Sequence, residues 1–116
     1  MKIEAHTIHN KKIAEITSDK MVINTVEDGL DLLGDLYYRD FDSVVIHEKN
    51  ITPHFFDLKT GIAGEILQKF AQYRLPLVII GDFSKYKSGS LEAFILESNK
   101  GRHINFRASI AEALRR

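Results

Sequence analysis

Hydrophobic and polar residues alternate at the start of the chain and later gather in short apolar runs. From Lys2 to Ile8 every second side chain is apolar or small, and Lys12 to Thr17 repeats this pattern. A period of two is typical of strands with one wet face. His9-Asn10-Lys11 between them predicts a turn, because Asn tolerates the left-handed backbone conformation. The N-terminus is therefore predicted to form a β-hairpin.

Three later segments are predicted to be strands. Ser43 to His47 and Leu75 to Ile80 are short apolar runs, the pattern of strands buried on both faces. His103 to Arg107 is the last predicted strand. The turn residues and polar stretches that separate these runs leave room for a helix between each pair of strands.

Four segments are predicted to be helices, beginning near Thr25, Thr60, Ser90 and Ser109. Thr25 with Asp28, and Ser109 with Glu112, resemble capping boxes. The predicted buried face of the first helix is Val26, Leu30, Leu33 and Tyr37, with Leu36 beside them. That of the second is Ile62, Ala63, Ile66, Leu67, Phe70 and Tyr73. Gly64 is predicted to be a point of close packing and Gly101 a left-handed C-cap.

The order of these elements predicts one α/β domain over residues 1–116. We expect a mixed, mostly parallel five-stranded sheet with an N-terminal β-hairpin and about four helices. The strand–helix–strand units imply parallel pairing, and the hairpin adds one antiparallel neighbour. The residues predicted to be largely buried are Ile46, Phe56, Ile66, Phe70, Ile79 and Phe94.

Composition narrows the classes of function. Sixteen basic residues balance sixteen acidic ones, so no net charge favours binding to nucleic acid or to a membrane surface. Without cysteine the chain has neither disulfides nor thiolate chemistry. The polar start and the lack of a long apolar run argue against a signal peptide or a membrane span. The predicted location is the cytoplasm.

Two stretches carry a family resemblance that extends over nearly the whole chain. FFDLKTGIAGEILQKFAQY, from Phe55, and GDFSKYKSGSLEAFILESNKG, from Gly81, resemble the bacterial domain-of-unknown-function 4180 family. That family has no assigned activity, so the resemblance implies a bacterial protein but little chemistry.

The order of elements is also similar to that of the STAS domain, the fold of anti-sigma-factor antagonists. In that fold an Asp-Ser pair opens a helix, and the Ser is phosphorylated. The comparable residues here are Asp57 and Leu58, so the hydroxyl is missing, and Thr60 is the nearest alternative. The resemblance implies a regulatory or protein-interaction module without the phosphorylatable Ser.

Acidic and hydroxyl side chains follow the predicted buried strands. Glu48, Asp57 and Asp82 are expected at the carboxyl edge of the sheet, where ligands of α/β proteins bind. A pair of carboxylates there could perform acid–base chemistry. The alternative is that Asp57 caps a helix and Asp82 ends a strand in a turn. His47 and His54 match no known metal-ligand spacing, and Ser88-Gly89-Ser90 is not a nucleophile elbow.

Two function classes remain open. The first is a non-enzymatic STAS-like interaction module, with a binding surface predicted at Asp57, Thr60, Asp82, Ser84, Ser88 and Asn99. The second is a small hydrolase-like acid–base enzyme using Asp57, Asp82 and Glu48. No cofactor, metal or catalytic residue is assigned. The expected partner is an unknown protein, a small ligand or a second copy of the chain.

Overall fold

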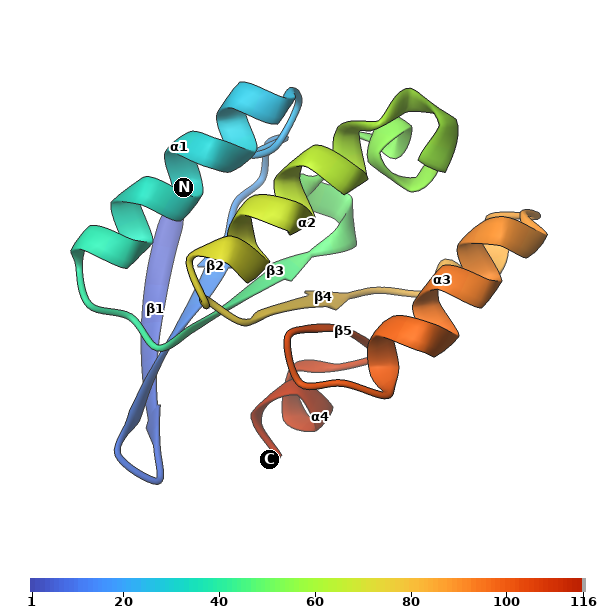
Figure 1. Cartoon of the computed structure of the whole chain (residues 1–116). Coiled ribbons are helices and arrows are strands. Elements are labelled where there is room, and N and C mark those ends of the chain that lie inside the picture. The colour runs from blue at the N-terminus through green and yellow to red at the C-terminus, as the bar shows by residue number, and fades with distance from the viewer. Residues whose placement is uncertain (116) are drawn as a thin grey trace.

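The computed structural model describes residues 1–115 and shows one α/β domain with a five-stranded sheet. The elements follow one another as β1 (Lys2–Ile8), β2 (Lys11–Thr17), α1 (Val26–Tyr38), β3 (Ser43–His47), α2 (Ile62–Gln72), β4 (Leu77–Ile80), α3 (Gly89–Asn99), β5 (Ile104–Arg107) and α4 (Ile110–Leu114) (Figure 1). Short 3-10 turns span Glu48–Asn50, Pro53–Phe56, Leu58–Thr60 and Phe83–Lys85.

The strands lie in the sheet in the same order as in the sequence, β1-β2-β3-β4-β5. β1 pairs antiparallel with β2, and the other three pairings are parallel. The predicted fold class is confirmed, including the N-terminal hairpin and the mixed sheet. Each parallel connection carries its helix back across the sheet, as strand–helix–strand units require.

The hairpin turn is one residue shorter than predicted. His9 and Asn10 both have left-handed backbones, with φ of 50° and 66°. Such a two-residue turn matches the twist of the flanking strands. Lys11 is therefore the first residue of β2, and Glu4 lies directly opposite Glu15.

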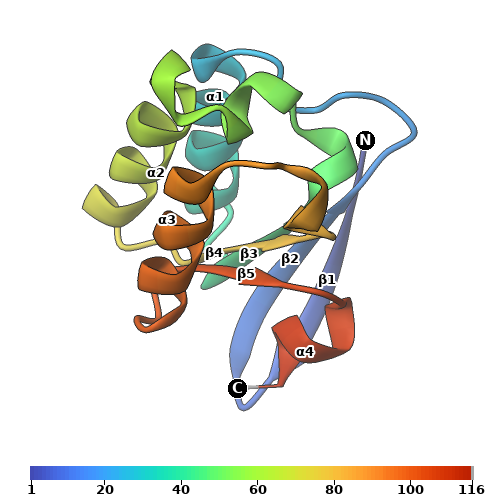
Figure 2. The same ribbon diagram turned by 90° about the vertical axis from the view of Figure 1, so that its right-hand side faces the viewer.

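The two faces of the sheet are covered unequally. Helices α1, α2 and α3 cover one face, where α1 contacts α2, and α4 lies on the other face (Figure 2). The main core lies under the three helices. A smaller apolar layer on the opposite face consists of Ile13, Val45, Val78, Ile80 and Ala113. Alternation along each buried strand supplies both layers, because successive side chains point to opposite faces.

Five of the six residues predicted to be buried are buried in the structure, namely Ile46, Phe56, Ile66, Phe70 and Ile79. Phe94 is only half-buried, which corrects the prediction. It lies on α3, whose neighbour in the sheet is the edge strand β5. An edge position leaves α3 without a second helix on its outer side.

The first helix is capped as predicted, and Leu33 and Leu36 of its predicted inward face are buried, but the rest of that face is shifted. Thr25 and Asp28 form the capping box. The residues that face the core are Gly29, Leu32, Leu33 and Leu36, whereas Leu30 is half-buried and Tyr37 is 52 % exposed. A Cβ at Gly29 would lie 2.6 Å from Ile66 Cδ1 of α2, so the missing side chain allows close contact of the two helices.

The close packing predicted at Gly64 is wrong. A Cβ there would meet no atom within 4 Å, and the residue is exposed. Tyr73, expected on the buried face of α2, is 48 % exposed because it follows the last helical turn.

Helix boundaries also differ from the predictions. Helix α2 begins at Ile62, after the left-handed Gly61 with φ of 80°. Ser88, not Ser90, is the N-cap of α3 and accepts a hydrogen bond from Leu91 N. Among the described residues Gly61 is the one glycine with a positive φ, so the left-handed C-cap predicted at Gly101 is wrong. Ser109 caps α4 as predicted.

Candidate functional site

The segments that follow β3 and β4 meet at the carboxyl edge of the sheet. The ring of Phe56, from the first segment, stacks on Tyr86 of the second with centroids 4.9 Å apart. Phe56 also contacts Phe83 at 5.8 Å. The structure therefore brings together the two stretches in which the sequence predicts a binding surface.

Glu48 joins the same two segments through its carboxylate. Oε2 accepts a hydrogen bond from the Tyr86 hydroxyl at 2.5 Å and lies 2.7 Å from Lys85 Nζ. A Cβ at Gly81 would be 2.6 Å from Glu48 Cβ, so glycine is needed for this approach. Burial, followed by the hydrogen bond to Glu48, raises the pKa of Tyr86 above its ordinary range.

The other acids predicted here act as caps. Asp82 Oδ1 accepts hydrogen bonds from Ser84 N at 3.1 Å and from Ser84 Oγ at 2.6 Å. The hydrogen bond from the Ser84 hydroxyl is the main reason that the pKa of Asp82 is lowered. Asp57 Oδ1 accepts from Lys59 N at 3.3 Å. The Thr60 hydroxyl donates to the backbone carbonyls of His54 and Asp57, at 2.8 and 3.0 Å.

A groove of about 590 Å³ lies between the segment after β4 and α3. Its walls are Phe83, Ser84, Tyr86, Lys87, Ser88, Gly89, Leu91, Glu92, Ile95 and Leu96. Ser84 and Ser88 of the predicted surface are thus both in this groove. Leu96, at the side of the groove, is 64 % exposed, so the groove has an apolar edge open to solvent.

Asn99 lies apart from this groove, at the opposite end of α3. Its Oδ1 accepts a hydrogen bond from Phe106 N at 2.8 Å, which ties the end of the helix to β5. It lines a separate hollow of about 300 Å³ with Lys100, Gly101, Arg102, Asn105 and Arg107. Of the predicted surface, Ser84 and Ser88 share the groove, whereas Asn99 does not.

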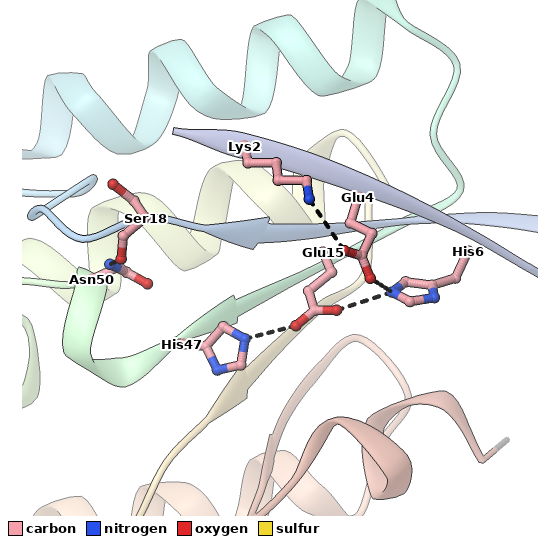
Figure 3. A network of polar contacts seen from close by, with 7 residues as sticks. All are labelled: Lys2, Glu4, His6, Glu15, Ser18, His47 and Asn50. Atoms are coloured by element: carbon pink, nitrogen blue, oxygen red, sulfur yellow. Dashed lines mark hydrogen bonds and ion pairs between the residues drawn. The ribbon is translucent and has the colours of Figure 1, made fainter.

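A second polar cluster lies on the sheet face opposite α1, α2 and α3. Glu15 Oε1 is 2.9 Å from His6 Nε2, and Glu15 Oε2 is 2.9 Å from His47 Nε2 (Figure 3). Glu4 Oε2 lies 3.5 Å from the same His6 nitrogen. Glu15 is 8 % exposed, so one nearly buried carboxylate is held between two imidazole rings.

Opposing effects act on the Glu15 carboxyl. Burial alone would raise its pKa. Hydrogen bonds and charge interactions with His47 and His6 lower the pKa by more than burial raises it, so the pKa lies below its ordinary value. The carboxylate is therefore charged under ordinary conditions. A charged group this close to two histidines is a feature that the sequence analysis missed.

The length of the hairpin turn decides whether Glu4 lies opposite Glu15, and the predicted turn was one residue too long. A three-residue turn at His9-Asn10-Lys11 places Glu4 opposite Ile16, whereas the observed two-residue turn places it opposite Glu15. His47 comes from β3, and its position beside Glu15 depends on the parallel register of β2 and β3. That register cannot be obtained from the period of either strand alone.

Comparison with known proteins identifies the family but no activity. None of the helices within residues 1–115 is long and apolar enough to cross a membrane. No curated protein and no solved structure matches the chain. Residues 8–116 match the family described as a domain of unknown function, DUF4180, and the chain therefore belongs to that family.

Proposed function

We propose that this protein is a non-enzymatic regulatory or protein-interaction module of the cytoplasm, similar in role to STAS domains. The observation that carries the proposal is the groove of about 590 Å³ beside α3, with Leu96 64 % exposed at its edge. Exposed apolar surface of this kind, rimmed by polar groups such as Lys87 and Glu92, is typical of interaction sites.

The apolar positions of α3 support this use of the groove. Leu91 is buried and Ile95 is half-buried, whereas Leu96 points to solvent. A partner helix could place its apolar side chains against Ile95 and Leu96, as helix-in-groove complexes do. The partner we propose is a protein, and a second copy of the chain would satisfy the same chemistry.

The competing proposal, a hydrolase-like acid–base enzyme, is weaker because its carboxylates already have partners. Asp82 has a lowered pKa, so it holds no proton to donate near neutral pH. Glu48 is paired with Lys85 and with the Tyr86 hydroxyl. Asp57 caps the turn at Leu58–Thr60.

The position comparable to the STAS phosphoserine favours a module without a phosphate switch. Leu58 has no hydroxyl, and the Thr60 hydroxyl is engaged by the backbone carbonyls of His54 and Asp57. We therefore expect mass spectrometry of the protein from its natural host to find no stoichiometric phosphate on Thr60.

The groove is tested by changing its exposed edge. The variant Leu96→Glu places a charge on the apolar rim, and it should fold normally because the residue is 64 % exposed. A partner captured from cells of the source organism by the wild type should be lost by this variant. Tyr38→Glu is the matched control, because Tyr38 is 88 % exposed on a different helix.

The same variants test self-association. If the partner is a second copy, size-exclusion chromatography should show a dimer for the wild type and for Tyr38→Glu, and a monomer for Leu96→Glu. The proposal fails if every protein captured by the wild type is captured equally by Leu96→Glu and the oligomeric state is unchanged.

A further inference from the structure

The hairpin brings two carboxylates and an imidazole together on one face of the sheet. Glu4 and Glu15 are directly opposite each other in the β1–β2 pair, and His6 lies two residues beyond Glu4 on the same face. One ligand atom from each of the three lies within 4.8 Å of the other two. Figure 3 shows these side chains pointing toward one another.

Two acids facing each other across a strand pair are unfavourable on their own. Like charges directly opposite destabilise a sheet, and Glu15 is 8 % exposed, so water screens its charge poorly. Lys2 Nζ lies 3.9 Å from Glu4 Oε1, but the Lys2 side chain is 75 % exposed and does not contact Oε2, the oxygen nearest His6. A cation between the two carboxylates would compensate both charges.

We propose that Glu4, His6 and Glu15 bind a divalent transition-metal ion, with Zn²⁺ as the best fit. One imidazole nitrogen and two carboxylate oxygens are ligands that Zn²⁺ accepts, and three protein ligands leave the fourth position for water. Two ligands bound tetrahedrally at about 2.1 Å lie about 3.4 Å apart. His6 Nε2 and Glu4 Oε2 are already 3.5 Å apart.

The other two pairs of ligand atoms must move. Those of Glu4 and Glu15 lie within 4.8 Å of each other and need to come to about 3.4 Å. His6 Nε2 and Glu15 Oε1 lie at a hydrogen-bond distance of 2.9 Å. When the ion binds at Nε2, a protonated His6 releases that proton to solvent, whereas a neutral His6 carries its proton on Nδ1 instead. A shift of about 0.5 Å then brings the pair to the distance expected for two zinc ligands. The site is accessible to the ion, because the side chains of His6 and Glu4 are 24 % and 48 % exposed.

His47 is a positioning residue in this arrangement. Its Nε2 lies 2.9 Å from Glu15 Oε2, the oxygen turned away from His6. Holding that oxygen leaves Oε1 directed at the site. Partners of this kind fix the orientation of metal-binding carboxylates and histidines, and their loss costs about 10- to 100-fold in metal affinity.

The experiment is a calorimetric titration of the tag-free, metal-stripped protein with ZnCl₂. We expect saturable binding of one Zn²⁺ per chain, weakened at least about tenfold by His6→Ala and by Glu4→Gln. His103→Ala is the control, because His103 is an exposed histidine outside the cluster, and it should bind like the wild type. Circular dichroism without metal establishes that each variant is folded.

Three outcomes would overturn the proposal. They are the absence of saturable binding, a stoichiometry well away from one, and wild-type affinity in a folded Glu4→Gln variant. The last remains decisive even if His6→Ala fails to fold, because Glu4 is half-exposed and its loss leaves the hydrogen bond between His6 and Glu15 intact. The cluster would then be a hydrogen-bonded network only.

The role of His47 has its own test. His47→Ala should weaken Zn²⁺ binding about 10- to 100-fold, and His47→Gln should recover much of the affinity, because its amide can donate to Glu15 Oε2. A positioning role is contradicted if the Gln variant binds as weakly as the Ala variant while both melt at the same temperature without metal.

Discussion

The hydrogen bond between Tyr86 and Glu48 has a consequence for the response of stability to alkaline pH. The hydroxyl lies 2.5 Å from Oε2, and burial together with the neighbouring carboxylate raises the pKa of Tyr86. The folded protein therefore keeps this proton at a pH where the unfolded chain, with a tyrosine pKa of about 10, has released it. The stabilisation is complete below that pH and is lost as the pH rises toward the higher folded pKa.

We expect the wild type to lose stability more steeply than Tyr86→Phe as the pH rises above about 10. Urea unfolding at a series of pH values measures this, and the difference between the two proteins removes the contribution of all other groups. Parallel curves would mean that Tyr86 does not titrate differently in the folded and unfolded states.

At the scale of elements, two helical glycines make a matched pair. Gly29 of α1 faces Ile66, where an added Cβ would lie 2.6 Å from Cδ1, whereas Gly64 of α2 is exposed with no atom within 4 Å of an added Cβ. Alanine favours a helix over glycine by about 1 kcal/mol, so the two substitutions should differ in sign.

Gly64→Ala is expected to stabilise the protein by about 0.5–1 kcal/mol. Gly29→Ala is expected to destabilise it, because overpacking a core costs about 1–3 kcal/mol and outweighs the gain in helix propensity. Chemical denaturation of both variants measures the two changes. A gain in stability at Gly29 would show that Ile66 moves aside at little cost.

The same two helices show what a sequence can and cannot predict about an element. The period of 3.6 residues located α1 and α2, and the hydroxyl and acid of Thr25 and Asp28 located the start of α1. The period did not fix the exact phase of α1, because Leu33 and Leu36 are buried as predicted but Leu30 and Tyr37 are not. That phase depends on contact between Gly29 and Ile66, which are 37 positions apart in the sequence and meet only in the tertiary structure.

The candidate sites were predictable to a lesser degree. Short apolar runs correctly placed Glu48 and Asp82 just after parallel strands, and the ends of such strands share one edge. Their hydrogen-bond partners, such as Tyr86 for Glu48, come from distant segments. The cluster around Glu15 needed both the exact turn length and the register of β2 and β3. An error of one residue in the turn separates Glu4 from Glu15, and an error of one residue in the register separates His47 from Glu15.

At the scale of the whole molecule, the sheet divides the interior into a thick layer and a thin one. Ile79 and Ile80 are adjacent on β4 but point to opposite faces, Ile79 into the main core and Ile80 into the small layer under α4. Ile79 is fully buried and Ile80 is 7 % exposed. The two residues therefore allow the layers to be compared with the same substitution.

Ile79→Ala is expected to cost about 3–5 kcal/mol, because the closely packed main core limits the collapse of the cavity. Ile80→Ala is expected to cost about 2 kcal/mol or less, because one short helix can shift to fill the space. Equilibrium unfolding in urea gives both values. Equal losses would mean that α4 is held as firmly as the three helices on the other face.

The order of the strands, β1 to β5 without exchange, also bears on how the protein is made. A chain leaves the ribosome N-terminus first. Each strand of this sheet pairs with the strand translated just before it, so its neighbour is already available when it emerges. No strand has to insert between two that are already joined, and the sheet can grow in one direction as synthesis proceeds. Until translation of β5 is complete, the growing edge is the buried strand β3 or β4, whose apolar side chains are then the surface that the nascent chain most needs to protect.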